Sequence, residues 1–420
     1  MKRIPWGFLG VLLAVVLAVV WKLATELAAA RAAEAAARAA EAAARAEAEA
    51  ARAVAAAASA PDTARRISMD AFNAAEEWRQ ARVLELYANM TDAGWDSAAR
   101  WKSYAQPDAP ERSCAVGSGA RQLLSDIALL SRAVAALPQL GNASRRFYLA
   151  LHTYHSTGLE GNTLTLPETL LTVAGQPLFG GFDSRVMPTP LTARSALEAQ
   201  CLAQLWVALD LASLPGRHKP TLDLASLPVS GLVDLNSAIT RGSNTPTGLR
   251  RHPVAIGHQR VLLPMPDEVP VLVDEYLAWL RAAVLHGGGA AGGEAGDSAA
   301  LERQLTLACD VHTRFVFVHP FADGNGRLAR TLAGLVLQRA GLPAPMFTRE
   351  ARAEYMAAVA AATMDRNYAP LAALHAAAVR RALACQIMLA DGAPPTSNDG
   401  PLEDVLSRSG CFLHPTQKTS

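Results

Sequence analysis

Cysteine is scarce in this sequence, and the few cysteines are scattered. The 420 residues contain five cysteines, no two of which form a C-x-x-C pair. Zinc ribbons and small disulfide frameworks need several closely spaced cysteines, so both classes are excluded. This cysteine usage leaves the redox compartment of the protein open.

An excess of charge of one sign is also missing. The chain has 39 basic and 38 acidic side chains, which gives a formal net charge of +1. A nucleic-acid-binding domain would show a strongly basic face, so we expect no nucleic-acid partner. Hydrophobic residues make up 51% of the chain, but alanine inflates this fraction, and it does not indicate a polytopic membrane protein. The length suits one large or two small domains with an ample core.

A long apolar run stands at the N-terminus. Lys2 and Arg3 precede apolar residues 4–21, and a tryptophan lies near each end of the run. Such a run almost spans the hydrocarbon layer of a bilayer, and the basic pair is expected to stay in the cytosol. We therefore predict a short cytosolic end and a single-pass transmembrane anchor over residues 1–23, with the body of the chain lumenal or extracellular. A cleaved signal peptide is the alternative.

Three segments separate this anchor from the next domain. Residues 24–60 are mostly Ala, Glu and Arg and predict a semi-rigid helical stalk. A coiled coil is the alternative, although the segment has no Leu or Ile heptad. Residues 61–105 have the pattern of a helical hairpin, with one degenerate tetratricopeptide unit as the alternative. Residues 106–120 are rich in Pro, Gly and Ser and predict a linker.

Residues 121–390 carry repeated helical patterns that are broken by Gly- and Pro-containing loops. These patterns predict a mainly α domain. Within it, residues 286–298 are rich in Gly and Ala and are expected to form a disordered insertion. Residues 391–420 are rich in Pro, Ser and Gly and predict a flexible tail.

The most informative stretch is residues 319–330, which read His-Pro-Phe-Ala-Asp-Gly-Asn-Gly-Arg-Leu-Ala-Arg. An apolar run precedes it and a helical pattern follows, so we predict a tight loop between two buried helices. Unpaired N–H groups at a helix N-terminus attract phosphate, and glycines let it approach closely. The stretch also supplies a candidate base, His319, a candidate metal carboxylate, Asp323, and two arginines about a turn apart. Together these groups indicate a phosphate-transfer site.

This string resembles the signature of the Fic domain, His-x-Phe-x-Asp/Glu-Gly-Asn-Gly-Arg-x-x-Arg, at every specified position. The resemblance implies a helical Fic fold with a small β-hairpin flap. It also implies an enzyme that transfers AMP from ATP to a hydroxyl side chain of a protein, with His319 as the catalytic base and Asp323 as the carboxylate that holds Mg²⁺. The residues that the resemblance assigns to ATP binding are Glu160, Val254, Ala255, Ile256, Gly257, Asp323, Gly324, Asn325, Gly326, Arg327, Leu328, Ala329, Arg330 and Tyr355.

Residues 247–257, followed by residues 261–266, resemble the flap of this family. Strand alternation around a Gly-His-Gln turn predicts a β-hairpin here. A flap of this kind pairs with the backbone of the target as an added strand and brings its hydroxyl in line with the α-phosphate. Arg251 is one of the residues that fall on the flap pattern. Tyr355 matches a family tyrosine that packs near the adenine.

Ser156, Glu160 and Gly161 match the inhibitory helix motif of Fic proteins, Ser/Thr-x-x-x-Glu-Gly/Asn, and the resemblance implies such a helix over residues 150–166. A carboxylate beside Arg330 forms a bidentate pair and fills the place of the ATP γ-phosphate, which holds AMP transfer low. The same carboxylate can orient a water molecule onto a phosphodiester, so hydrolytic removal of AMP becomes available.

Membrane-anchored Fic enzymes do both on the endoplasmic-reticulum chaperone BiP, and this chain resembles them. The resemblance implies a single-pass type II protein of the endoplasmic-reticulum membrane with a lumenal catalytic domain. A BiP-like lumenal chaperone is the expected protein substrate, and relatives form homodimers. Two other functions stay open, namely a Fic-type transferase of another phosphate-linked group and an ATP-sensing, membrane-tethered scaffold.

Overall fold

In the computed structural model the chain divides into two units, residues 1–77 and 78–420. The predicted anchor, stalk, helical hairpin and tail lie outside the part of the chain that the structure describes. Among the described helices, none is both long and apolar enough to cross a membrane. The described residues all belong to the second unit and are 114, 121–137, 140–174, 190–214, 222–241, 245–254, 263–287 and 298–390.

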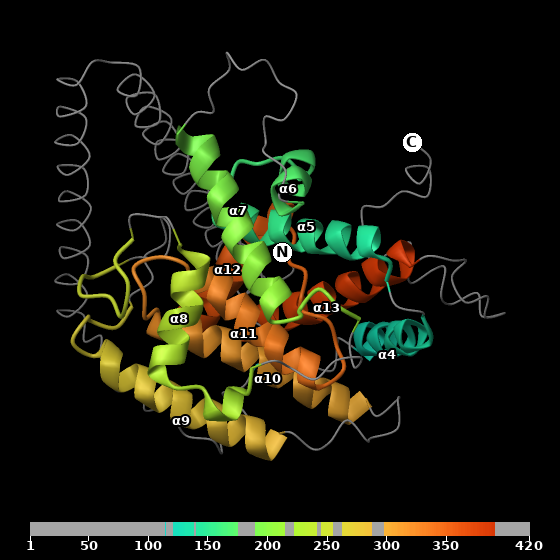
Figure 1. The fold of residues 1–420 in the computed structure, drawn as a ribbon. Coiled ribbons are helices and arrows are strands. Elements are labelled where there is room, and N and C mark those ends of the chain that lie inside the picture. The colour runs from blue at the N-terminus through green and yellow to red at the C-terminus, as the bar shows by residue number, and fades with distance from the viewer. Residues whose placement is uncertain are drawn as a thin grey trace, which may run out of the picture. The chain divides into compact units, whose positions relative to one another are not determined.

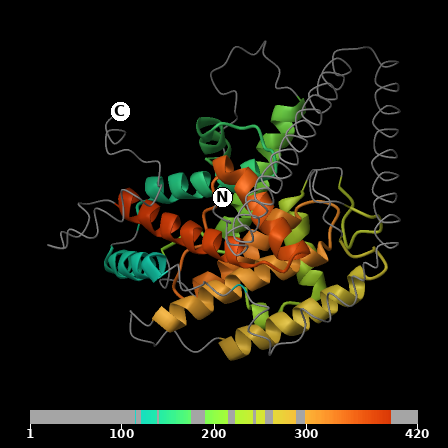
Figure 2. The same ribbon diagram turned by 180° about the vertical axis from the view of Figure 1, so that it is seen from behind.

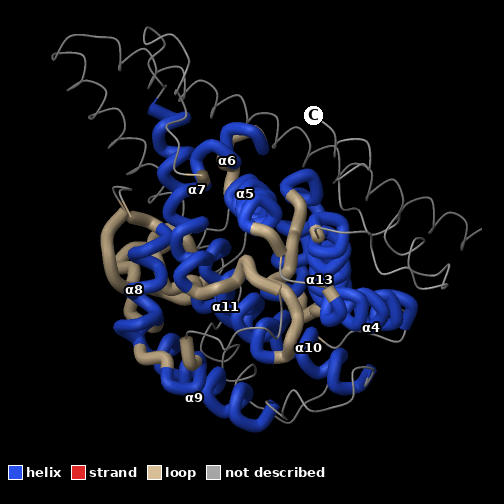
Figure 3. The backbone as a smooth tube through the Cα atoms, turned by 45° about the vertical axis from the view of Figure 1, so that its right-hand side comes forward, coloured by secondary structure: helices blue, strands red, loops and turns tan. Residues whose placement is uncertain are grey.

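The described part of the second unit consists of helices joined by irregular loops, and no strand occurs in it (Figures 1 and 3). This confirms the predicted mainly α domain. The α-helices are α4 (Arg121–Ala136), α5 (Asn142–Leu159), α6 (Leu166–Val173), α7 (Pro190–Ala208), α8 (Val229–Ile239), α9 (Val269–Gly287), α10 (Ser298–Val318), α11 (Asn325–Arg339), α12 (Arg352–Met364) and α13 (Ala369–Leu389), with 3-10 turns η3 (Leu224–Ser226) and η4 (Arg349–Ala351).

Helices α10 and α11 form the centre of the fold and hold between them the loop of residues 319–324 (Figure 1). Every residue is buried from Val311 to Val318 in α10 and from Arg327 to Gln338 in α11. A helix buried on all sides is stable only when other elements cover each face. Helices α4, α9, α12 and α13 pack against α10, and α5 and α8 pack against α11. Figure 2 shows α9 and α10 side by side from behind.

Helix α5 ends one residue before Glu160, so the predicted inhibitory helix stops earlier than expected and begins earlier, at Asn142. Gly161 takes a left-handed φ of +95°, a conformation that ends helices and favours glycine. After an irregular stretch, Thr165 and Glu168 form a reciprocal capping box that starts α6. Glu160 therefore stands on the corner between two helices.

The described parts of the predicted flap, residues 247–254 and 263–266, form no strand, which corrects the expectation of a hairpin there. Instead of pairing with an opposite strand, the Arg250 N–H donates to the oxygen of Pro320 at 2.8 Å. The segment is thus bonded to the loop between α10 and α11. The turn of the flap, with Ala255, Ile256 and Gly257, lies outside the described residues.

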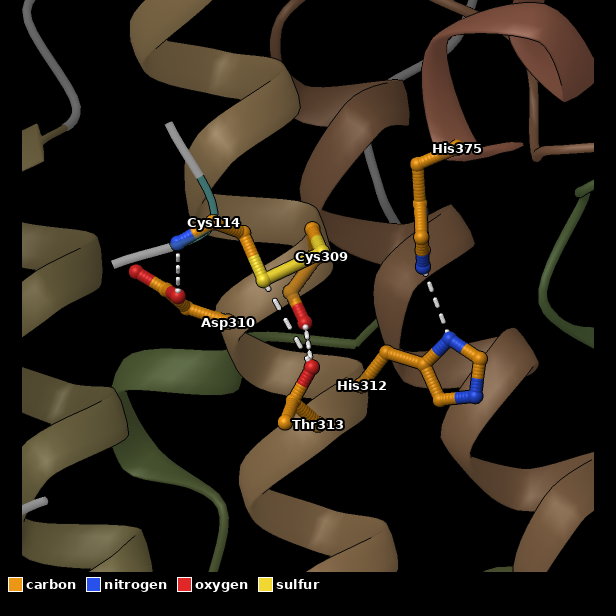
Figure 4. Close-up of a disulfide and its surroundings, with 6 residues drawn as sticks. All are labelled: Cys114, Cys309, Asp310, His312, Thr313 and His375. Carbon is orange, nitrogen blue, oxygen red and sulfur yellow. Dashed lines mark hydrogen bonds between the residues drawn. A yellow bond between two sulfur atoms is a disulfide. The ribbon is translucent and has the colours of Figure 1, made fainter. Parts of the chain in front are cut away.

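A disulfide joins Cys114 to Cys309 of α10 (Figure 4), a pairing that the sequence left open. The Cys114 N–H also donates to Oδ1 of Asp310 at 2.9 Å. Burial raises the pKa of Asp310 to about 6, although this hydrogen bond and the nearby Arg314 oppose the rise. The disulfide fastens the chain ahead of α4 to the helix that leads into the loop of residues 319–324. Cys385 is disulfide-bonded as well, whereas Cys201 is free and buried.

Replacing Cys114 by Ser is expected to lower the free energy of unfolding by about 2–4 kcal/mol, because the bond closes a long loop of the unfolded chain. Urea unfolding under non-reducing conditions measures this change. Cys201→Ser is the matched control, since it removes a buried thiol that is not cross-linked, and it should cost clearly less. Equal midpoints for the two variants would contradict a stabilising role for the disulfide.

Candidate active site

His319 lies where α10 ends, and its backbone has a left-handed φ of +46°. Its Nδ1 is 3.1 Å from the carbonyl oxygen of Val316. A carbonyl only accepts hydrogen bonds, so Nδ1 carries the ring proton and Nε2 keeps its lone pair. Burial, together with the positive charge of Arg250, lowers the pKa of His319 to about 4. The ring is therefore neutral at pH 7, and Nε2 is ready to accept a proton.

Two asparagines fix the loop that follows. The side chain of Asn325 bonds to both main-chain groups of Phe321, accepting from its N–H at 3.0 Å and donating to its oxygen at 2.7 Å. Nδ2 of Asn236 donates to the oxygen of Asp323 at 2.9 Å. Gly324 has a φ of +85°, and a Cβ there would lie 2.7 Å from Nδ2 of Asn236, so only glycine fits. The Asn325 side chain thus serves the loop, and its part in phosphate binding is left to the main-chain N–H.

Asp323 presents a carboxylate that is only partly occupied by protein donors. Its Oδ1 accepts from the Gly324 N–H at 2.6 Å and from Nη2 of Arg327 at 2.9 Å, while Oδ2 lies 3.9 Å from Nη2 of Arg194. Burial raises the pKa of Asp323, but Arg327 and the Gly324 N–H outweigh it and bring the pKa below its usual value. Mg²⁺ is usually held by one or two carboxylates and substrate phosphates, so this ionised group, with Oδ2 the freer atom, fits the implied metal.

Arg327 is 2% exposed, and part of its guanidinium forms no hydrogen bond with the described residues. Its Nη2 bonds to Asp323, while Nε and Nη1 have no partner among the residues that the structure describes. A buried guanidinium with unmet donors is costly unless an anion pairs with it. Arg327 is therefore suited to an anionic ligand.

Arg330 is also 2% exposed, and its guanidinium is bonded on every nitrogen. Nη2 donates to Oε1 of Glu160 at 2.7 Å and to the oxygen of Ser156 at 2.8 Å. Nε donates to the Ser156 hydroxyl at 3.0 Å, and Nη1 donates to the Tyr355 hydroxyl at 3.0 Å. Burial lowers the pKa of Arg330, but Tyr355 and Glu160 raise it above its ordinary value, so the charge persists. Glu160 thus pairs with Arg330 as predicted, but through the single contact between Oε1 and Nη2 rather than in the predicted bidentate arrangement.

A buried chain of hydrogen bonds continues from Arg330 into the core. The Tyr355 hydroxyl is 2.8 Å from Nε2 of His312. Nδ1 of His312 is 2.7 Å from Nε2 of His375, and Figure 4 shows these two rings facing each other. Because a guanidinium only donates, the Tyr355 hydroxyl donates onward to His312, and His312 donates to His375. Burial lowers the pKa of both histidines, so neither adds charge beside Arg330. Tyr355 is 3% exposed, and its predicted contact with adenine stays a prediction.

Gly326 shows how closely the Glu160 carboxylate approaches α11. A Cβ at Gly326 would lie 2.2 Å from Oε1 of Glu160, far below any real contact distance. The carboxylate therefore rests against the backbone in the first turn of the helix, where unpaired N–H groups favour an anion. Glu160 occupies the position that the sequence assigned to a phosphate.

Three further residues that the sequence assigned to ATP binding form none of the side-chain contacts described above. Leu328 and Ala329 are fully buried in α11, so their side chains face the core and only their backbone belongs to the site. Val254 is partly buried beside the described end of the flap.

Arg250 is a residue that the sequence did not single out. It is 4% exposed, and its Nε donates to the oxygen of His319 at 2.7 Å, with a further bond to the oxygen of Pro264. The neighbouring Arg251, which was expected on the flap pattern, is exposed. No local signal distinguishes these two consecutive arginines, and only the fold shows which of them is buried.

These contacts describe an anion site with a proton acceptor nearby, an arrangement typical of enzymes that transfer phosphate-linked groups. Sequence comparison supports the resemblance that the motif indicated. Residues 226–337 match the model of the Fic/DOC family. The match includes the loop of residues 319–324 but not α5, Arg349 or Tyr355.

Individual relatives are more distant. A protein adenylyltransferase Fic of Drosophila mojavensis is 28% identical over 209 residues, which cover 49% of this chain and 34% of the relative. The matched part thus spans about a third of that curated relative. A Fic-domain-containing signaling protein of Bacteroides thetaiotaomicron superposes with a TM-score of 0.47 at 20% identity, covering 63% of this chain and 97% of its own. For Fic-1 of C. elegans the TM-score is 0.46 at 21% identity, covering 64% and 72%.

The low pKa of His319 predicts that its ring stays neutral as the pH falls from 7 to 5. Long-range nitrogen–proton correlation spectra of labelled protein should show an Nδ1-protonated ring with a titration midpoint of about 4. A His319→Asn variant assigns the signal. Because folding lowers the pKa of His319, the unfolded chain binds this proton first, and the free energy of unfolding falls as the pH drops from about 6.5 to about 4. A midpoint near the ordinary value would contradict the described surroundings of the ring.

Proposed function

We propose that this chain is a Fic-type protein adenylyltransferase that moves AMP from ATP to a Ser or Thr hydroxyl of another protein and is held in check by Glu160. The observation that carries the proposal is the Glu160 carboxylate, which pairs with Arg330 at 2.7 Å and rests against the first turn of α11. A carboxylate there stands in for a phosphate. The Fic/DOC match and the name of the curated relatives support AMP as the transferred group.

The proposed reaction is one displacement at the α-phosphorus of ATP. Nε2 of His319 takes the proton of the target hydroxyl while its oxygen forms a bond to phosphorus. The bond between that phosphorus and the pyrophosphate oxygen breaks, so AMP stays on the protein and pyrophosphate leaves. The N–H groups of Asn325 and Gly326, in the first turn of α11, would bind the phosphate oxygens. Arg327, with its donors in reserve, binds the β-phosphate, and Arg330 binds the γ-phosphate.

Asp323 would hold Mg²⁺ through its freer oxygen, Oδ2. When bound, the ion neutralises charge that develops on the leaving pyrophosphate. The lowered pKa of Asp323 keeps the carboxylate ionised at neutral pH for this role. Its bond to Arg327 also fixes the orientation of both side chains.

Glu160 and the γ-phosphate compete for one guanidinium. While Glu160 keeps its short bond to Arg330, ATP cannot place its γ-phosphate there, and the α-phosphorus is not aligned for attack. With Glu160 in place, the same carboxylate would orient a water molecule onto an AMP–protein bond, which gives the enzyme a de-AMPylating activity. One side chain thereby sets the balance of two opposite reactions.

The proposed location is the lumen of the endoplasmic reticulum, with residues 1–23 as a single-pass type II anchor. The Cys114–Cys309 disulfide supports an oxidising compartment, because disulfides persist there and are rare in the cytosol. A lumenal chaperone of the BiP type is the proposed substrate, and the enzyme is proposed to form a homodimer.

Glu160→Gly is expected to raise AMP transfer by about tenfold or more, because it frees Arg330 for the γ-phosphate, and to lower de-AMPylation. Incorporation of labelled AMP from ATP into candidate lumenal chaperones measures the first activity, and release from AMP-modified chaperone measures the second. Glu275→Gln, an exposed carboxylate on α9, is the control and should leave both rates unchanged. Equal rates for Glu160→Gly and the unaltered protein would refute inhibition by Glu160.

His319→Ala is expected to abolish AMP transfer in both the unaltered and the Glu160→Gly background, because the proton acceptor is lost. ATP binding, followed by calorimetry, should persist, which separates lost chemistry from lost structure. For a target modified by the unaltered protein or by Glu160→Gly, the added mass in mass spectrometry shows whether the transferred group is AMP or another phosphate-linked group. Full AMP incorporation by the variant would remove His319 from its role as base.

A further inference from the structure

The end of α5 is held by a specific turn. The Gly161 N–H donates to the oxygen of Gly158, and the Asn162 N–H donates to the oxygen of Thr157, both at 3.1 Å. With Gly161 left-handed, these two bonds form a Schellman motif in which Glu160 is the C-cap residue. The direction of the Glu160 side chain is therefore set by the geometry of this turn.

Two arginines outside α5 bind carbonyl groups in this turn and just after it. Nε of Arg352 donates to the oxygen of Leu159 at 2.8 Å. Nη1 of Arg349 donates to the oxygen of Leu164 at 2.8 Å, and Nη2 donates to the oxygen of Asn162 at 3.3 Å. Both arginines come from η4 and the start of α12, almost 200 residues further along the chain. A helix C-terminus attracts cations and leaves its last carbonyls unpaired, so this position suits guanidinium groups.

Arg349 is packed into α5 as well as bonded to it. Its main-chain N–H lies 3.3 Å from Nδ1 of His155, and its guanidinium carbon lies 4.7 Å from the ring centre of Tyr154. A Cβ at Gly158 would come within 2.8 Å of Cβ of Arg349, so glycine at this position permits the close approach. Arg352, in contrast, is exposed, and its bond to Leu159 depends little on core packing.

Apart from Arg330, no described residue forms a hydrogen bond with the Glu160 carboxylate, so the turn decides where this carboxylate lies. Its side chain is 36% exposed, whereas its partner Arg330 is 2% exposed and fixed by Ser156 and Tyr355. Of the two members of the pair, Arg330 is the fixed one. Any loosening of the turn therefore moves the Glu160 carboxylate rather than the guanidinium.

We propose that Arg349 and Arg352 form a clamp of positioning residues that holds the end of α5 and so keeps Glu160 on Arg330. The inference rests on the proposed inhibition by Glu160 and names the residues that set its strength. Loss of a clamp arginine lets the turn move, the carboxylate leaves the γ-phosphate position, and AMP transfer rises. A purely structural role would lower transfer instead, so the sign of the effect separates the two.

The first test compares AMP transfer by full-length Arg352→Ala with the unaltered protein and with Glu160→Gly. We expect Arg352→Ala to raise transfer at least about fivefold, and the double variant with Glu160→Gly to transfer no faster than Glu160→Gly alone. Arg352→Lys should restore part of the inhibition, since it keeps a donor and a charge near Leu159. Arg281→Ala is the matched control, because that exposed arginine also donates to a main-chain oxygen, that of Ala225 at 2.9 Å, but lies on α9.

The second test follows hydrogen exchange of the amides in residues 157–164, with His319→Ala added to every protein so that turnover plays no part. Faster exchange in Arg352→Ala and Arg349→Lys than in Arg281→Ala is expected. Unchanged exchange together with unchanged or lower transfer by a folded Arg352→Ala would overturn the clamp. If Glu160→Gly itself fails to raise transfer, the proposed inhibition is wrong and the clamp falls with it, whereas activation by Glu160→Gly alone overturns only the clamp.

Discussion

The ion pair between Arg330 and Glu160 is the interaction on which the site depends. A guanidinium removed from water must be matched by oxygen partners, and Arg330 has four: the hydroxyl and carbonyl oxygens of Ser156, the Tyr355 hydroxyl and the Glu160 carboxylate. Three of these are neutral, and only Glu160 brings a negative charge. The site is therefore built to hold one anion beside Arg330, and any ligand phosphate must replace the carboxylate to take that position.

The core behind Arg330 is arranged so that it adds no competing charge. His312 and His375 are buried and neutral, and their hydrogen bonds run away from the guanidinium through Tyr355. A protonated histidine there would weaken the attraction of the site for anions. Buried polar groups are stable when each has a hydrogen-bond partner. In the series of hydrogen bonds from Arg330 to His375, Nδ1 of His375 is the one atom without a partner among the described residues. The positive charge is thus concentrated where α11 begins.

The local part of this design was predictable from the sequence, and the long-range part was not. The stretch from His319 to Arg330 encodes its own loop, because its glycines and its position before a helix determine where unpaired N–H groups point. The place of Glu160 followed from a family resemblance rather than from the residues around it. Arg250, Asn236 and the Cys114–Cys309 pairing depend on contacts between segments that are 69 to 195 residues apart, and nothing in their local sequence marks them.

Gly326 is the position at which the Glu160 carboxylate and the backbone of α11 come closest. The Glu160 carboxylate lies where the Cβ of any other residue would be, so the pairing of Glu160 with Arg330 requires glycine here. A phosphate that approaches the same N–H groups has the same requirement, because a side chain would hold its oxygens away from the helix. In the proposed function, the Glu160 carboxylate and the substrate phosphate therefore compete for the same space as well as for the same guanidinium. A mutation that enlarges this position would disturb both states together, whereas a change in the turn that ends α5 acts on the carboxylate alone. For this reason control of the site is expected to lie in α5 and its contacts.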